Sequence, residues 1–209
     1  MNIFQQLIQQ AIINGVSVET IVLLLLLPLV VSVVAAARHF IGFRGFGILI
    51  PATISVVLAA TGIINGILVF LTILAVATFA RMVSRKLKLQ YLPRMAVVLW
   101  FVSLGVLAMI FIFPTTISIF PILILILLAE NFIEVQIEKS FREAVQLTLE
   151  TLIIALIGWF ILSLKALQQF ALTRPEIVVL VPLVFNVILG RFTGLRLLEY
   201  WRFRRLLRR

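Results

Sequence analysis

Long apolar runs constrain this chain more than any other feature of its sequence. A hydrocarbon layer of about 30 Å needs about 20 apolar residues in a helix that rises about 1.5 Å per residue. Hydrophobic residues make up 63% of the 209 residues. Seven runs come near the required length, at residues 18–37, 46–61, 64–80, 95–113, 117–133, 146–164 and 175–190. The sequence therefore predicts an all-α membrane protein with a bundle of about seven transmembrane helices.

The second, fifth and seventh runs are short and contain Pro51, Pro121 and Pro182. Because proline removes a backbone donor, each is expected to be a tilted span, a broken helix or a re-entrant segment buried by its neighbours. We expect the second and fifth runs to approach each other through their prolines.

Two parts of the chain repeat a similar order of segments. Residues 18–80 and 95–164 each contain a long span, a break, a short span with proline and a third span. Three crossings in each part would make them inverted repeats, an arrangement typical of transporters. The expected architecture is thus two inverted three-helix units plus one helix. The alternative is that ordinary membrane helices tolerate these prolines.

Both ends of the chain differ from the transmembrane domain, which we place at residues 16–190. Residues 1–15 put apolar side chains on one helical face and four glutamines on the other, which predicts a helix lying in the membrane interface. A signal peptide cut after residues 35–37 is disfavoured, because the amino end is not basic and the apolar core is too long. Residues 191–209 form a basic cytoplasmic tail whose aromatic and arginine side chains suit anionic headgroups.

Positive charge alternates along the chain. The sequence has 18 Lys and Arg residues, and with an outside amino terminus only Lys165 and Arg174 fall outside. Because cations are retained in cytoplasmic loops, we expect a multi-pass protein of the plasma (inner) membrane with a cytoplasmic carboxyl terminus. The basicity then reflects topology and contact with anionic lipid headgroups. It does not indicate a nucleic-acid-binding protein, because no soluble domain is left to carry a reading element.

Catalytic chemistry has few candidate residues. The chain has no cysteine, no aspartate and a single histidine, His39. These absences exclude a cysteine nucleophile, a two-aspartate pair and a clustered histidine metal site. The sequence accordingly predicts no catalytic residue, no metal and no cofactor, and it leans against an enzyme. His39 itself is expected to be an interfacial side chain.

Carboxylates near the ends of apolar runs are better candidates for binding. Glu130 closes the fifth run and Glu150 lies one to two turns inside the sixth, where an ionisable group is costly and usually functional. The basic turn with Arg38 and Arg44 is a source of partners for both. The acidic stripe between the two runs has two readings: a solvated helix face that pairs with nearby cations, or a site for cations or amines.

Four stretches carry a resemblance to a known family. They are "LLLLLPLVVSVVAAARHFIGFRGFGILIPATI", "LPRMAVVLW", "FPILILILLAENF…FREAVQLTLETL" and "LGRFTGLRLLEYWRF". In this order the chain resembles, over about residues 20–205, the seven-transmembrane domains usually fused to an inactive transglutaminase domain. That domain precedes the membrane domain in the family and is not among these 209 residues, so no periplasmic binding role is expected.

The most specific parts of the resemblance are the turn at residues 38–51 and the motif at residues 190–200. Together with the two carboxylates, they give our candidate binding or docking residues. These are Arg38, Arg44, Pro51, Glu130, Glu150, Arg191, Thr193, Gly194 and Glu199.

The resemblance also implies a function. Members of the family are expected to work with an ATP-grasp amide ligase, and the layout around Pro51 is similar to the small membrane subunit of poly-gamma-glutamate synthases. We therefore expect a non-catalytic membrane scaffold or conduit that partners such a ligase in the synthesis or export of a peptide-like polymer. The alternative is a secondary transporter or channel for a small polar solute. A homo-oligomer is open in both cases.

Overall fold

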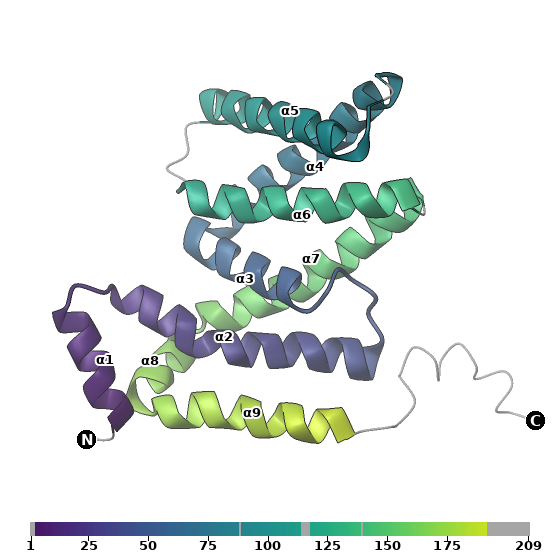
Figure 1. Ribbon diagram of the computed structural model, residues 1–209. Helices are drawn as coiled ribbons and strands as arrows, with labels where there is room; N and C mark the ends of the chain where they lie inside the picture. Colours follow the sequence, from purple (N-terminus) through teal and green to yellow (C-terminus); the bar gives the residue numbers. More distant parts are fainter. Residues whose placement is uncertain (1–2, 88, 114–117, 139, 192–209) are drawn as a thin grey trace, which may run out of the picture. The chain divides into compact units, whose positions relative to one another are not determined.

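The computed structural model describes residues 3–87, 89–113, 118–138 and 140–191, and all the regular elements in these ranges are helices (Figure 1). Their bounds are α1 Ile3–Ile13, α2 Val18–Ala36, the π-helix η1 Ala37–Ile41, α3 Leu49–Thr61, α4 Ile63–Lys86, α5 Tyr91–Ile112, α6 Ile119–Glu138, α7 Phe141–Ser163, α8 Lys165–Thr173 and α9 Pro175–Arg191. The predicted all-α polytopic fold is confirmed.

Several helix ends are set by local sequence. Ser17 begins α2, because its hydroxyl accepts the amide of Thr20 at 3.3 Å. Ser140 does the same for α7, where it accepts the amide of Glu143 at 3.2 Å in a Ser-x-x-Glu sequence. The residue that follows α1 and Asn14 is Gly15, with a φ of 90°, as a left-handed stop requires.

Five described helices are long and apolar enough to cross a membrane: α4, α5, α6, α7, and α2 continued through η1. The pair α8 and α9 makes a sixth candidate, although it bends by 103° at the break between its helices. The segment α3 has only 13 residues, or about 20 Å, which is shorter than a hydrocarbon layer. It remains the short second segment that the sequence predicts.

The expectation of a short fifth segment is wrong. The helix α6 has 20 residues and continues to Glu138, so it is as long as an ordinary span. Pro121 is its third residue, where the missing N–H would have no intrahelical partner anyway. The proline therefore does not break the helix.

The chain forms two compact units. Unit 1 contains residues 1–56 and 150–209, and unit 2 contains residues 57–149, so that α3 and α7 belong partly to each. Each unit groups helices from both of the halves that the sequence suggests as repeats. The predicted inverted repeat and the approach of Pro51 to Pro121 concern the relation between units and stay predictions.

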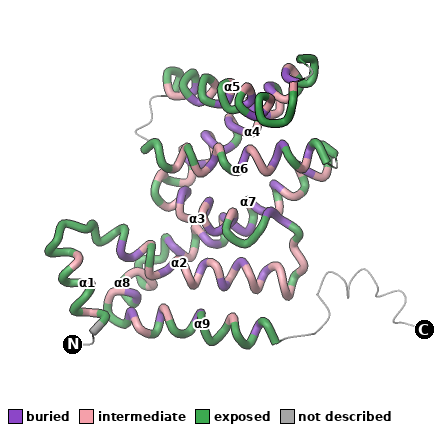
Figure 2. The backbone as a smooth tube through the Cα atoms, viewed as in Figure 1, coloured by how far each residue is buried: buried purple, intermediate pink, exposed green. Residues whose placement is uncertain are grey.

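In unit 1 the first span packs against the last. The helices α2 and α9 lie side by side and run in the same direction (Figure 1). The core includes fully buried Leu26, Val30 and Ala155 (Figure 2). Between the two helices, Nδ2 of Asn186 donates to the hydroxyl of Ser32 at 2.6 Å.

In unit 2 the helix α4 packs against both α5 and α6. Phe70, Ile73 and Val102 are almost completely buried there. The Cβ that an alanine would place at Gly105 would lie 2.6 Å from the side chain of Val76, so the glycine allows α4 and α5 to approach closely.

Candidate functional site

The turn after the first span is an irregular segment of unit 1 that several hydrogen bonds hold in place. The amide of Gly42 donates to the carbonyl of Ala37 at 3.2 Å, which closes the π-helix, and Gly42 then adopts a left-handed φ of 93°. A π-turn often marks a functional position in a helix. The chain stays irregular through residue 48, so the new helix starts at Leu49, later than the sequence predicts, with Pro51 in its first turn.

Side chains of α7 hold this turn in place. Oε2 of Glu150 accepts the amide of Arg44 at 2.6 Å, and Oγ1 of Thr151 accepts the buried amide of Phe46 at 2.8 Å. Between them, a Cβ on Gly45 would lie 2.7 Å from Oγ1 of Thr151 and 3.3 Å from its backbone. Only glycine fits this approach without displacing the turn.

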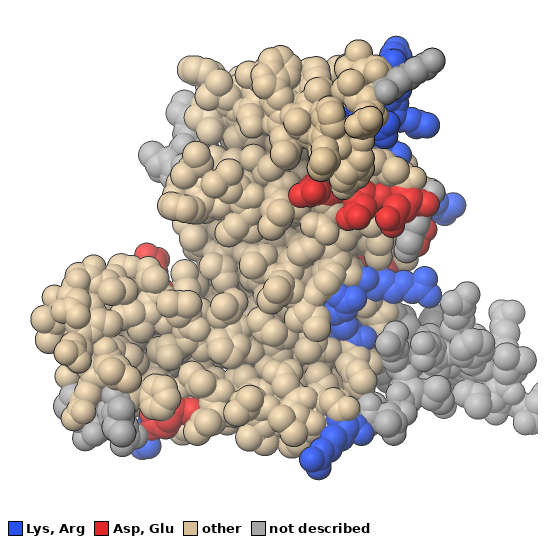
Figure 3. Space-filling view, in the orientation of Figure 1, with Lys and Arg blue, Asp and Glu red and all other residues tan. Residues whose placement is uncertain are grey.

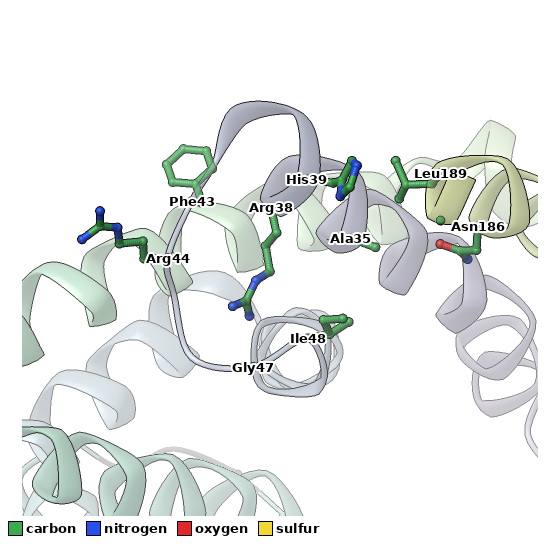
Figure 4. Close-up of a pocket in the computed structure, with 10 residues that line it drawn as sticks. Ala35, Arg38, His39, Phe43, Arg44, Gly47, Ile48, Asn186 and Leu189 are labelled. Atoms are coloured by element: carbon green, nitrogen blue, oxygen red, sulfur yellow. The ribbon is translucent and has the colours of Figure 1, made fainter. Parts of the chain in front are cut away.

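A basic recess opens beside the turn. It has a volume of about 710 Å³ and is lined by three basic residues (Arg38, His39, Arg44) and three large apolar residues (Phe43, Ile48, Leu189), with Asn186 and Gly190 from α9. Figure 4 shows the side chain of Arg38 reaching towards Gly47 and Ile48, whereas that of Arg44 points away. Of the two arginines, Arg38 is therefore the one that reaches into the recess.

One hydrogen-bond donor of Arg38 lacks an acceptor. Its Nη1 atom is buried, and the described part of the chain offers it no acceptor. A buried charged donor without a partner costs free energy, which an anionic ligand can recover. The recess is thus suited to hold an anion.

The sequence-predicted site residues fall in three places. Arg38, Arg44, Pro51 and Glu150 come together around the turn in unit 1, with Glu150 bound to the main chain of Arg44. Glu130 is half-buried on α6 in unit 2. Arg191 is the exposed last residue of α9. Thr193, Gly194 and Glu199 lie outside the described residues.

Unit 2 contains a polar network that the sequence reasoning missed. Arg81 donates from Nη1 to Oε1 of Gln136 at 2.6 Å and from Nη2 to its carbonyl oxygen at 2.5 Å. Nε2 of Gln136 then donates to the hydroxyl of Thr78 at 3.2 Å. The sequence feature that indicates this network is Gln136 itself, a glutamine within an apolar helix, because a glutamine side chain needs hydrogen-bond partners when it is buried.

Unit 2 also presents a charged end, made by the ends of α4 and α6 and the start of α7. Its exposed members are Arg85, Lys86, Glu134, Glu138 and Arg142. Figure 3 shows the acidic side chains gathered over the end of α6, beside basic ones. The surface thus carries both signs of charge.

Comparison with known proteins agrees with the fold. No curated protein and no solved structure matches the chain significantly. One family model matches residues 5–207, nearly the whole sequence, and it describes seven transmembrane helices usually fused to an inactive transglutaminase. The resemblance that the turn and the motif at residues 190–200 suggest is therefore confirmed, and the chain belongs to this family of multi-pass membrane proteins.

Proposed function

We propose that the protein is a non-catalytic membrane scaffold or conduit. In this proposal it holds a cytoplasmic ATP-grasp amide ligase at the plasma membrane while a peptide-like polymer is made or exported. The observation that supports the proposal is the charged end of unit 2, where Glu134 and Glu138 are exposed and so are Arg85 and Lys86.

The mixture of signs argues for a protein partner. Anionic headgroups attract cations in any order and repel carboxylates, so a surface meant only for lipid has no use for an exposed acidic row. A protein can match both signs at fixed positions, which gives specificity and register. The charged end is therefore better suited to docking than to anchoring alone.

The proposal requires this end to face the cytoplasm. Reporter fusions after residues 90 and 209 should both behave as cytoplasmic, and a fusion after residue 170 as external, because positive charge stays inside. An external reporter at residue 209 would contradict an odd number of crossings from an outside amino terminus.

Docking is tested by affinity purification of the full chain from membranes, with the co-purified proteins identified by mass spectrometry. We expect an ATP-grasp ligase with the wild type and its loss in a Glu134→Lys, Glu138→Lys variant. The matched control, Lys165→Glu with Arg174→Glu, changes as many charges on the predicted outer side. A second comparison sets Arg191→Ala and Glu199→Ala beside a chain lacking Arg208 and Arg209. Absence of any ligase with the wild type, or equal loss in the controls, overturns the proposal.

A secondary transporter is the second candidate, and the interrupted helices favour it. The short α3 and the 103° bend between α8 and α9 resemble the discontinuous segments that form sites in transporters. Uptake of a labelled polar solute by proteoliposomes, saturable and absent from protein-free vesicles, would favour this candidate over the scaffold.

A further inference from the structure

The basic recess of unit 1 is a candidate site for a small ligand, separate from the proposed docking of a cytoplasmic ligase. Three of its described lining residues are basic and none is acidic. Its volume of about 710 Å³ lies in the range of about 300–1,000 Å³ that is usual for small-ligand sites. Charge and size together indicate an anionic ligand of moderate size.

The chemistry of Arg38 narrows the class of anion. A guanidinium presents its donors in a planar fork that fits phosphate or carboxylate oxygens, and Nη1 of Arg38 is buried without an acceptor among the described residues. Arg44 adds positive charge beside the recess, and His39 and the amide of Asn186 add polar groups to its lining. A phosphate has enough oxygens to engage several of these donors at once.

The apolar part of the recess indicates where the phosphate comes from. Phe43, Ile48 and Leu189 share the lining with the basic residues, and Ile48 is 44% exposed. On the neighbouring surface Leu49 and Ile188 are 70% and 64% exposed. A free phosphate would not need these surfaces, whereas the acyl chains of a lipid would cover them.

We propose that the basic recess binds the phosphate headgroup of an anionic lipid of the inner leaflet. Arg38 donates to the phosphate oxygens, the charge of Arg44 adds attraction, and the acyl chains lie against the apolar wall. The end of the first span is predicted to lie at the cytoplasmic interface, where such headgroups are found. The site is independent of any cytoplasmic ligase.

Native mass spectrometry of the detergent-solubilised full chain tests the site. The chain is titrated with phosphatidylglycerol, with phosphatidylcholine as the lipid without net charge, and with inorganic phosphate. We expect a complex with one phosphatidylglycerol, and at least about tenfold weaker binding of this lipid by Arg38→Gln. The matched control Arg85→Gln removes an exposed arginine on the same predicted side. It should bind phosphatidylglycerol within about twofold of wild type, because this arginine contributes only non-specific attraction of anionic headgroups.

A second variant keeps every charge. Gly190 lines the recess within α9, and a Cβ there would meet no atom within 4 Å, so we expect the side chain of Gly190→Leu to be accommodated and to take up space in the recess. Gly190→Leu should also bind phosphatidylglycerol more weakly than wild type. This variant provides the test of the site if Arg38→Gln fails to fold. The proposal is overturned if Gly190→Leu binds like wild type, or if Arg38→Gln and Arg85→Gln lose the lipid equally. It is also overturned if inorganic phosphate binds as tightly as phosphatidylglycerol.

Discussion

Arg38 in unit 1 and Arg81 in unit 2 are residues of one type in comparable sequence positions. Each lies near the predicted inner end of a long apolar helix and would count equally in a topology rule. In the structure both terminal nitrogens of Arg81 donate to Gln136, although its Nε atom is buried without an acceptor among the described residues. In Arg38 it is a terminal nitrogen, Nη1, that is buried without an acceptor there. The terminal nitrogens of the guanidinium thus bind another helix in unit 2, whereas in unit 1 one of them has no acceptor among the described residues.

The reason for the difference lies in the neighbouring helix. Gln136 is two residues from the end of α6, so its carbonyl is among the last four of a helix that have no intrahelical donor. A cation from another helix satisfies this carbonyl and also interacts favourably with the helix dipole. Near Arg38 no carbonyl or carboxylate of the described residues accepts from the Nη1 atom, so this nitrogen has no such role.

The largest effect should come from Arg81→Met, which keeps the length of the side chain and removes its donors. It leaves two acceptors of Gln136 unsatisfied, and this glutamine is only 3% exposed. We expect a loss of about 3 kcal/mol in the free energy of unfolding, measured by denaturant titration in detergent micelles. The double variant with Gln136→Leu should lose less than the sum of the single variants, and strict additivity would show that the two residues are not coupled.

A smaller effect is expected from Gly45→Ala, which tests how tightly the turn is held. The new Cβ would meet both the hydroxyl and the backbone of Thr151, which is fully buried on α7. We expect a loss of about 2 kcal/mol, because the helix backbone cannot move away. The double variant Gly45→Ala, Thr151→Ala lacks the closest contact. Its loss in the free energy of unfolding should therefore be smaller than the sum of the losses of the two single variants.

Gly190→Ala is the matched control for the glycine at position 45, since its Cβ would meet open space. Because alanine is the better helix former, this change should leave the free energy of unfolding unaltered or raise it by up to about 1 kcal/mol in the same titration. Equal destabilisation by both alanines would mean that the turn is not packed as the structure shows it.

Thr151→Val should cost less than the glycine change. It keeps the shape of the side chain and removes the acceptor of the Phe46 amide, which is buried. An unsatisfied buried amide costs about 1–2 kcal/mol. Thr151→Ser keeps the hydroxyl and should recover most of the loss. Slower amide hydrogen exchange at Phe46 in the serine variant than in the valine variant would confirm the hydrogen bond.

The fold could largely be predicted from the sequence because bilayer thickness dictates the length of apolar runs. The residues at which the helices begin and end were harder to predict. The run at 117–133 extends to Glu138 because polar residues continue a helix once its hydrogen bonds are established. Nor did apolar content predict α8, a nine-residue helix with two glutamines and little buried surface.

The candidate site could be predicted in part. The turn with Arg38 and Arg44 could be found, because charges and glycines interrupt an apolar chain there. The contact of Glu150 with this turn could be suggested only as one of several possible contacts of this carboxylate, since 106 residues separate it from Arg44 in the sequence. The difference between Arg38 and Arg81 could not be foreseen at all, because it depends on which side chains each helix meets.

The smallest effect on stability should come from Arg38→Ala, and this makes it the most informative change. If Arg38 were a structural cation like Arg81, its removal would cost a similar amount. Because Nη1 has no acceptor in the described chain, removal also ends the cost of burying an unpaired donor, which offsets the lost packing of the aliphatic stem. We expect the free energy of unfolding in lipid-free micelles to stay within about 0.5 kcal/mol of wild type. Added phosphatidylglycerol should then stabilise the wild type and not the variant, because a ligand stabilises only the folded state that binds it. A loss of about 3 kcal/mol without lipid would place Arg38 in the same class as Arg81 and remove the distinction between the two units.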